Sequence, residues 1–241
     1  MNNEFKPLNP KVVLGVAAHP DDLDFGASAT MAKFAANGAH VYYLILTDGS
    51  KGSDDKNLTS EQLIAIRQKE QKAALQAIGG KEVIFLNHPD SYLEVTMNLK
   101  KEIVREIRRL KPDVVITNDP TVVYSRKRGF VNHSDHRAAG QATLDAVFPL
   151  ARDHLTYPDL LRDGLKPHKV ATILLNNFDQ QNYYIDVSDT LDKKFMALKE
   201  HTSQIKDLDA VKERFTMMAK QAGHNAGYSY AEGFMRLDMP L

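Results

Sequence analysis

The feature that most constrains the fold is a repeated alternation between short apolar runs and segments with helical periodicity. Apolar runs typical of buried strands cover residues 11–18, 39–47, 81–87, 112–117, 169–177 and 181–187. Helical patterns cover residues 27–38, 60–78, 97–111, 133–151, 189–201 and 207–222. Buried strands that alternate with helices are typical of a mainly parallel sheet with helices on both faces. The sequence therefore predicts an α/β, Rossmann-like, three-layer fold in which ligands bind at the carboxyl ends of the strands.

The length and composition are those of a globular domain, and we expect residues 1–241 to form a single one. Hydrophobic residues make up 43% of the chain and charged residues 26%, which argues against a disordered protein. Lys+Arg and Asp+Glu balance at 31 each, so no net charge attracts nucleic acid, and we expect no nucleic-acid partner.

The sequence also bears on the location of the protein. No apolar run approaches the roughly 18 residues that a membrane-spanning helix needs. The first residues, "MNNEFKPLNP", lack the basic and apolar regions of a secretory signal. We therefore expect a cytoplasmic protein without an integral membrane segment. The sequence leaves open whether the chain forms a homo-oligomer.

Two clusters of histidine and aspartate follow predicted strands. The chain has no cysteine, so any metal must be held by His, Asp or Glu. "HPDD" (19–22) follows the first apolar run, and "HSDH" (133–136) follows the loop after the fourth. His19 and Asp22 can converge on one point, and a third ligand from the second cluster would complete a catalytic zinc site with one open position. Asp21, between them, is a candidate acceptor for a proton from metal-bound water.

These clusters have other possible interpretations. Two aspartates before a helix often serve only as a cap, and a lone histidine is usually structural. A dinucleotide-binding module would need Gly-x-Gly-x-x-Gly after the first strand, where this chain has "GVAAHPDD". A zinc-stabilised interaction protein would have no use for Asp21, and a two-metal phosphoesterase would need more ligands. Both clusters at one edge of one sheet favour a catalytic metal site.

The same segments give the chain a resemblance to a known family. "AAHPDDLDFG" with the later "NHSDHRAAG" is similar to the signature of the LmbE-like (PIG-L) family of zinc-dependent N-deacetylases. The resemblance extends through "LTDGSKG", "IRQKEQKAAL", "FLNHPDSYLE", "KKFMALKEHTSQ" and "YAEGFM". It implies a hydrolase in which water activated by Zn²⁺ removes the N-acetyl group from an N-acetylglucosamine-type sugar or glycoconjugate. The implied partner is thus a small-molecule N-acetylated sugar.

The resemblance also implies roles for individual residues. The implied zinc ligands are His19, Asp22 and His136. Asp21 would be the general base, and His133 would stabilise the oxyanion of the tetrahedral intermediate. Asp135 would orient His133 or the groups that hold the metal. Whether Asp21 or His133 protonates the leaving amine stays open.

Three positions depart from the family pattern. Asp24 stands where the family often has Glu, and Ser134 stands where Pro is common. Val131 occupies a position where some members have a Tyr that polarises the amide carbonyl, so Tyr124 is a candidate replacement. The alternative function is therefore a zinc amidase that releases another acyl group or acts on a non-sugar amide.

Polar loops at the same edge of the sheet supply candidate substrate contacts. "TDGSKGSDD" follows the second apolar run, and "NHPDSY" follows the third. The candidates to bind sugar hydroxyls are Asp48, Arg67, Asp90 and Arg126. Sites that pair with hydroxyls reject analogues lacking them, since the site's own polar groups are then left unpaired. The alternative is that Asp48 and Arg67 only stabilise their loop through a salt bridge.

Overall fold

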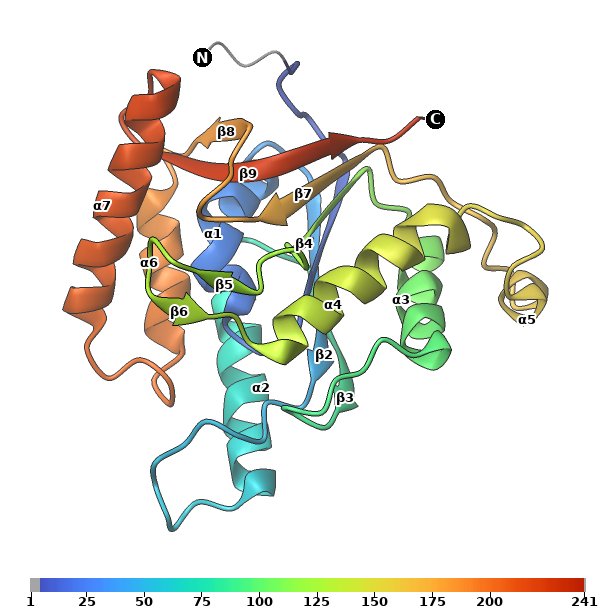
Figure 1. Ribbon diagram of the computed structural model, residues 1–241, viewed down its shortest axis with the longest axis horizontal. Coiled ribbons are helices and arrows are strands. Elements are labelled where there is room, and N and C mark those ends of the chain that lie inside the picture. Colours follow the sequence, from blue (N-terminus) through green and yellow to red (C-terminus); the bar gives the residue numbers. More distant parts are fainter. Residues whose placement is uncertain (1–4, 241) are drawn as a thin grey trace.

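The computed structural model describes residues 5–240, in which a seven-stranded sheet lies between two groups of helices (Figure 1). The strands of this sheet are β1 (Val12–Ala17), β2 (His40–Thr47), β3 (Glu82–His88), β4 (Val114–Asn118), β7 (Thr172–Asn176), β8 (Tyr183–Asp186) and β9 (Ala231–Asp238). The helices are α1 (Asp22–Ala36), α2 (Ser60–Ala77), α3 (Met97–Leu110), α4 (Ser134–Asp145), α5 (Pro158–Arg162), α6 (Leu191–Glu200) and α7 (Leu208–Ala226). The segment η1 (Ala146–Leu150) follows α4 and contains a kink at Phe148, whose backbone is extended, and a hairpin of β5 (Tyr124–Ser125) and β6 (Phe130–Val131) lies outside the sheet.

The order of the strands places a ligand-binding crevice beside β1. The strands lie in the order β3-β2-β1-β4-β7-β9-β8. All pairs from β3 to β7 are parallel, and β9 is antiparallel to both of its neighbours. The prediction of a mainly parallel sheet is therefore confirmed. The chain adds β2 and β3 on one side of β1 and then β4 on the other, and ligands bind at the carboxyl ends of strands where the order reverses.

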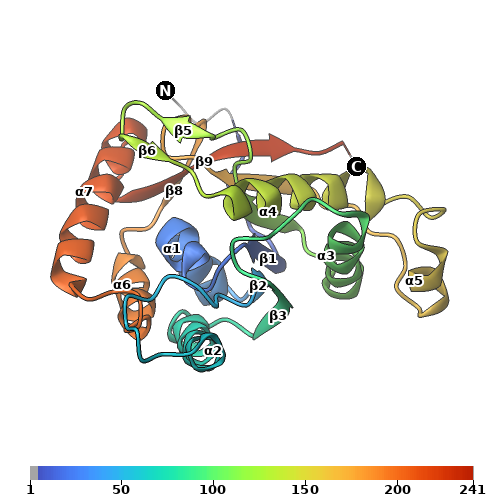
Figure 2. The same cartoon turned by 60° about the horizontal axis from the view of Figure 1, so that its bottom comes forward.

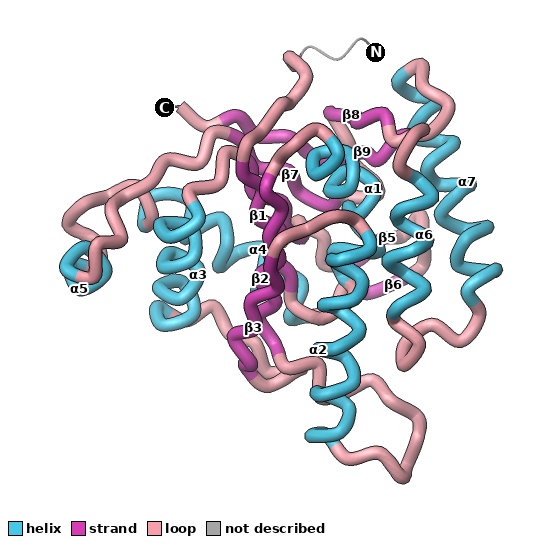
Figure 3. The backbone as a smooth tube through the Cα atoms, turned by 180° about the vertical axis from the view of Figure 1, so that it is seen from behind, coloured by secondary structure: helices cyan, strands magenta, loops and turns pink. Residues whose placement is uncertain are grey.

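Helices cover both faces of the sheet (Figures 2 and 3). Alternate residues of β1 explain this, because Val13 and Ala17 pack on the side of α1, α2 and α6. Leu14 and Val16 pack on the opposite side, against α3 and α4. All four are buried, so both faces need an apolar cover. The near-continuous apolar composition of the run at 11–18 follows from this position at the centre of the sheet.

Local signals fix the helix ends near the site. α2 begins with a capping box, in which the side chain of Thr59 accepts from the backbone of Gln62 and the side chain of Gln62 accepts from the backbone of Thr59. α1 begins at Asp22, five residues before the predicted start at 27. Asp22 and Asp24 lie in its first turn, where carboxylates interact favourably with the helix dipole. The two aspartates and the glycine within residues 22–26 obscure this turn in the sequence.

The strand β9 was absent from the prediction although it lies inside the sheet. It separates β7 from β8, and its Glu232 is buried. Lys194 of α6 neutralises this carboxylate across a contact of 2.7 Å between Nζ and Oε1, and its Nζ also donates to the carbonyl of Phe25. Lys194 is distant from Glu232 in the sequence, so the residues of β9 considered alone resemble a polar segment on the surface. The short helix α5 and the β5–β6 hairpin were also not predicted.

Membrane-spanning capacity can be judged from helix length and hydropathy. Between residues 5 and 240, no helix combines the length and the apolar character that crossing a bilayer requires.

Candidate active site

The turn between β1 and α1 has a conformation that is unusual for its residues. Asp21 adopts a left-handed backbone conformation, with φ 95° and ψ −30°. Such a conformation costs a non-glycine residue on the order of 1–3 kcal/mol and persists where its surroundings hold it. Here the side chain of Gln71 accepts the N–H of Asp21 at 2.8 Å, and Asp22 accepts the N–H of His19 at 2.9 Å. The turn thus presents His19 and Asp22 on one side.

Asp24 fixes the first turn of α1 against three other elements. Its carboxylate is fully buried. One oxygen accepts from Gln71 of α2 at 2.7 Å and lies 2.8 Å from Nε2 of His201, which follows α6. The other accepts from the hydroxyl of Tyr43 on β2 at 3.2 Å. Because Gln71 binds both Asp24 and the backbone of Asp21, the turn and the helix are held as one unit.

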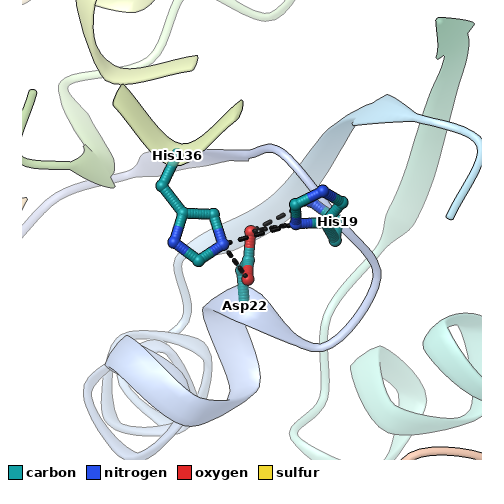
Figure 4. Close-up of side chains that lie close together, drawn as sticks. All are labelled: His19, Asp22 and His136. Atoms are coloured by element: carbon teal, nitrogen blue, oxygen red, sulfur yellow. Dashed lines mark hydrogen bonds and ion pairs between the residues drawn. The ribbon is translucent and has the colours of Figure 1, made fainter. Parts of the chain in front are cut away.

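Three nitrogen and oxygen donors converge beside this turn (Figure 4). His19 comes from the end of β1, Asp22 begins α1, and His136 lies in the first turn of α4. Nε2 of His136 is 3.0 Å from one Asp22 oxygen and 3.3 Å from Nδ1 of His19. The other Asp22 oxygen is 3.6 Å from Nδ1 of His19. The donor atoms of the three residues lie within 4.8 Å of one another, which fits a single metal ion.

The remaining ring nitrogens make the contacts that metal-binding histidines usually make. Nδ1 of His136 lies 3.1 Å from the side-chain oxygen of Asn132. Nε2 of His19 lies 3.2 Å from Asp90 and 3.3 Å from Asp135. When Nδ1 of His136 and Nε2 of His19 carry the protons, the other nitrogen of each ring has a free lone pair that points towards Asp22. The donor set therefore suits a divalent metal that accepts imidazole and carboxylate ligands.

Charge around the cluster favours a cation. Burial lowers the pKa of His19, but hydrogen bonds with Asp135, Asp22 and Asp90 outweigh burial and raise this pKa to about 12. A field that holds a proton on a buried imidazole would hold a metal cation in the same way. For Asp22, burial acts to raise the pKa, but the charge of His136 and the hydrogen bond with it keep this pKa well below its usual range.

Asp21 has the environment of a proton acceptor. Burial and the charge of Asp22 raise the pKa of Asp21 to about 6, although the charge of Arg67 acts in the opposite direction. Its carboxylate lies 3.3 Å from Nη2 of Arg67. At neutral pH the group is ionised, and its pKa is closer to neutrality than that of an exposed aspartate.

His133 and Asp135 occupy different surroundings. His133 caps α4, and its Nδ1 accepts the N–H of Asp135 at 3.1 Å, so the proton of the neutral ring is on Nε2. Burial and the charge of His19 lower the pKa of His133. Asp135 is fully buried and accepts the N–H of Ser91 at 2.7 Å. One of its oxygens lies 3.3 Å from Nε2 of His19, whereas the other lies 3.9 Å from Nδ1 of His133, so Asp135 positions His19.

A groove of about 750 Å³ opens beside the cluster. Asp22, His133 and His136 line one part of it. Phe25, Phe178 and Phe215 line another part, so the groove combines polar groups with aromatic surface. Its size is in the range of small-molecule binding sites.

The four predicted substrate contacts lie outside the lining of this groove. Asp48 accepts the N–H groups of Ser50 and Asp90 and so organises its loop. Arg67 is buried and donates to the carbonyls of residues 20, 49 and 51. Asp90 accepts the N–H of residue 51 and faces His19. Arg126 is exposed between β5 and β6. Contact of these residues with a substrate stays a prediction.

The candidate replacement for the missing tyrosine has a defined position. Tyr124 is the cross-strand partner of Val131 in the β5–β6 hairpin. Val131 lines the groove, whereas the side chain of Tyr124 is 57% exposed and is absent from the lining. A role for Tyr124 in polarising a carbonyl stays a prediction.

Several residues around the site were not anticipated. Gln71 holds the turn at Asp21, and its signal was weak because glutamines are frequent on helix surfaces. Asn118 and Asn176 end β4 and β7 and line the groove. Their position at the carboxyl ends of predicted strands was a usable signal, because that edge is where ligands bind.

Together, the fold and the donor cluster at its switch point define an α/β protein with a candidate metal-binding active site beside a groove. The sequence model of the PIG-L family, described as GlcNAc-PI de-N-acetylase, matches residues 14–147. The chain belongs to this family, and it is an N-deacetylase.

Relatives support this placement. Diacetylchitobiose deacetylase of Thermococcus kodakarensis is 33% identical over 231 residues, which cover 95% of this chain and 84% of that protein. The probable N-acetyl-alpha-D-glucosaminyl L-malate deacetylase 2 of Bacillus anthracis is 30% identical and covers 81% of this chain and 82% of its own length. The solved structure of N,N'-diacetylchitobiose deacetylase from Pyrococcus horikoshii superposes with a TM-score of 0.86 and 30% identity, over 95% of this chain and 85% of that one.

The contact between Asp24 and His201 makes stability depend on pH. Burial lowers the pKa of His201, but the hydrogen bond and charge of Asp24 raise it above its usual value. The folded state therefore binds a proton more tightly than the unfolded chain. The resulting stability is present in full below about pH 6.5 and is lost as the pH rises through the raised pKa.

We expect His201→Gln to reduce the free energy of unfolding by about 1–3 kcal/mol at pH 6, and by less at pH 9. Urea unfolding at both values measures this difference. His154→Gln is the matched control, because the side chain of His154 is 74% exposed. An effect of His201→Gln that grows with rising pH would contradict the assignment.

Proposed function

We propose that this chain is a zinc-dependent N-deacetylase that removes the acetyl group from an N-acetylglucosamine-type sugar or glycoconjugate. The observation that carries the proposal is the convergence of His19, Asp22 and His136 beside a large groove, with Asp21 close enough for the charges of Asp22 and His19 to shift its pKa. The names of the relatives support the sugar, since they describe deacetylases of diacetylchitobiose and of a glucosaminyl malate.

The metal would be held by His19, Asp22 and His136, with Asp90, Asp135 and Asn132 orienting the two imidazoles. Zinc fits this donor set because it accepts imidazole and carboxylate ligands and leaves one position open in catalytic sites. When bound, zinc supplies a Lewis acid that lowers the pKa of water from about 15.7 to about 7.

The protein's own side chains would carry the proton transfers. Asp21 accepts the proton that the attacking water loses, and its raised pKa makes it a better base than an exposed aspartate. The N–H of His133 at Nε2 donates to the amide oxygen as negative charge develops there. The departing amine receives its proton from Asp21 or from His133. Arg67 holds Asp21 in place through the contact of 3.3 Å.

Three expectations from the sequence stay predictions. These are the single domain over residues 1–241, the cytoplasmic location, and the contacts of the loop residues with the sugar. The state of association of the chain also stays open.

The first prediction of this proposal concerns metal content. Protein purified without chelator should hold close to one equivalent of zinc, and His136→Ala should lose most of it because one of three donors is removed. Elemental analysis by mass spectrometry measures this. His224→Ala, on the exposed surface of α7, is the control and should keep its zinc. Full zinc retention by His136→Ala would refute the ligand set.

The second concerns the role of Asp21. Asp21→Asn should keep zinc and lose turnover by about 10²–10⁴-fold, because an amide cannot accept the water proton. Steady-state kinetics together with metal analysis separate this effect from metal loss. Asp54→Asn is the control, since the side chain of Asp54 is 97% exposed. Loss of less than about tenfold would show that Asp21 is not the general base.

The third concerns the substrate. Acetate release should be faster from N-acetylglucosamine, its short oligomers and its glycosides than from N-acetyl-lysine peptides or simple N-acetyl amines. A preference for a peptide or for an amide without hydroxyls would favour the alternative of a non-sugar amidase. Release of a longer acyl group in preference to acetyl would instead correct the acyl specificity.

A further inference from the structure

Two asparagines at the sheet edge have polar atoms that the protein itself leaves unpaired. Asn118 ends β4, Asn176 ends β7, and the two are paired in the register of these parallel strands. Paired residues of neighbouring strands point to the same face, which here is the face covered by α1. The side-chain oxygens of both residues are buried and have no hydrogen-bond partner. Buried polar groups are nearly always paired, so this arrangement calls for an explanation.

The two asparagines differ from the other buried unpaired groups in their surroundings. The unpaired nitrogens of Arg67 and His201, for example, lie away from the groove, whereas Asn118 and Asn176 line it. Both residues are half-buried, so part of each of them faces a molecule bound in the groove although the oxygens themselves are covered. Each carboxamide offers one acceptor and an amino group with two donors, so it can pair with a hydroxyl in either direction.

Close packing keeps these carboxamides in place. A methyl group on Gly26 of α1 would overlap the side chain of Asn176. A methyl group on Gly140 of α4 would likewise overlap the backbone carbonyl of Asn118. The two helices can approach the strand ends only because glycine occupies both positions. The two asparagines are thus closely packed, with α1 against Asn176 and α4 against Asn118.

Asn118 and Asn176 lie on a different side of His19 from the loop that is predicted to bind the reacting sugar. Nε2 of His19 faces Asp90, which belongs to that loop, whereas its Nδ1 faces Asp22 and His136. Asp22 and His136 line the groove. The asparagines lie on this groove side. Gly26, which contacts Asn176, follows Asp22 by about one helical turn, or roughly 5 Å along α1.

Aromatic side chains make up a part of the remaining lining of the groove. Phe25 of α1 and Phe215 of α7 lie with ring centroids 5.5 Å apart, and Phe178 and Met218 also line the groove. Aromatic faces beside carboxamides match a ring that has apolar C–H faces and hydroxyls around its edge. A second sugar unit has this chemistry, whereas a lipid chain would leave the asparagines unpaired.

We propose that Asn118 and Asn176 form a subsite for the hydroxyls of the unit attached to the reacting sugar, so that the chain discriminates a disaccharide from a monosaccharide. This inference rests on the proposed function for the identity of the reacting group. The acetamide lies at the end formed by Asp22, His133 and His136, and the attached unit extends over the asparagines towards Phe215.

The test compares the specificity constants of N-acetylglucosamine and its β-linked disaccharide in wild type and in Asn118→Ala/Asn176→Ala. The ratio of kcat/KM for the disaccharide to kcat/KM for the monosaccharide should fall at least about tenfold in the double variant, mainly through KM. Asn57→Ala, in an exposed loop, is the matched control and should keep the wild-type ratio. A ratio within about twofold of wild type in the double variant would overturn the proposal.

Binding of the non-hydrolysable β-linked glucosamine disaccharide, measured by calorimetry, gives a readout that does not depend on turnover. Its Kd should rise at least about tenfold in the double variant, and melting temperatures within about 3 °C of wild type would show intact folding. If wild type released no acetate but bound the disaccharide through the asparagines, the proposed function would fail and the subsite would stand. If the double variant bound the disaccharide as tightly as wild type, the subsite would fail alone.

Discussion

The fully buried carboxylate of Asp24 is the interaction on which the site depends. It joins α1 to Gln71 of α2, to His201 after α6 and to Tyr43 of β2. A buried charge needs partners, and these partners come from three elements that are far apart in the sequence. The left-handed turn at Asp21 is held by the same Gln71. Packing around one side chain therefore sets the direction of both donors in the first cluster, although Asp24 itself contacts neither His19 nor Asp22.

The sheet explains why two short clusters meet. β1 and β4 are neighbours and run parallel, so the segments that follow them leave from one edge. His19 follows β1 directly, whereas His136 reaches the same point only after the β5–β6 hairpin and the start of α4. The parallel pairing of β1 and β4 brings the two segments to the same edge of the sheet, and the start of α4 then places His136 beside His19. The separation of 117 residues between the two histidines is thus no obstacle to a compact site.

Much of this arrangement could be predicted from the sequence, because it rests on local signals. Apolar runs located the parallel strands, and the two clusters located the edge of the sheet that carries the site. The rest depends on partners distant in the chain. Glu232 in β9 resembles a surface residue until Lys194 is placed beside it, and the backbone carbonyls to which Arg67 donates cannot be identified from its position in the sequence. The unpaired state of Asn118 cannot be deduced from a sequence, since it depends on what surrounds the side chain.

The interior position of β9 has a consequence for how the chain is made. β9 follows all other elements in the sequence, yet it pairs with β7 and β8 on both of its edges. While the ribosome is still translating α7, β7 has an open edge with unpaired backbone groups, and β8 has no neighbour in the sheet. Open edges of this kind invite pairing with other chains. Completion of the sheet is therefore a late event in biosynthesis, and the nascent protein passes through a period in which the edge of β7 and the strand β8 are unprotected.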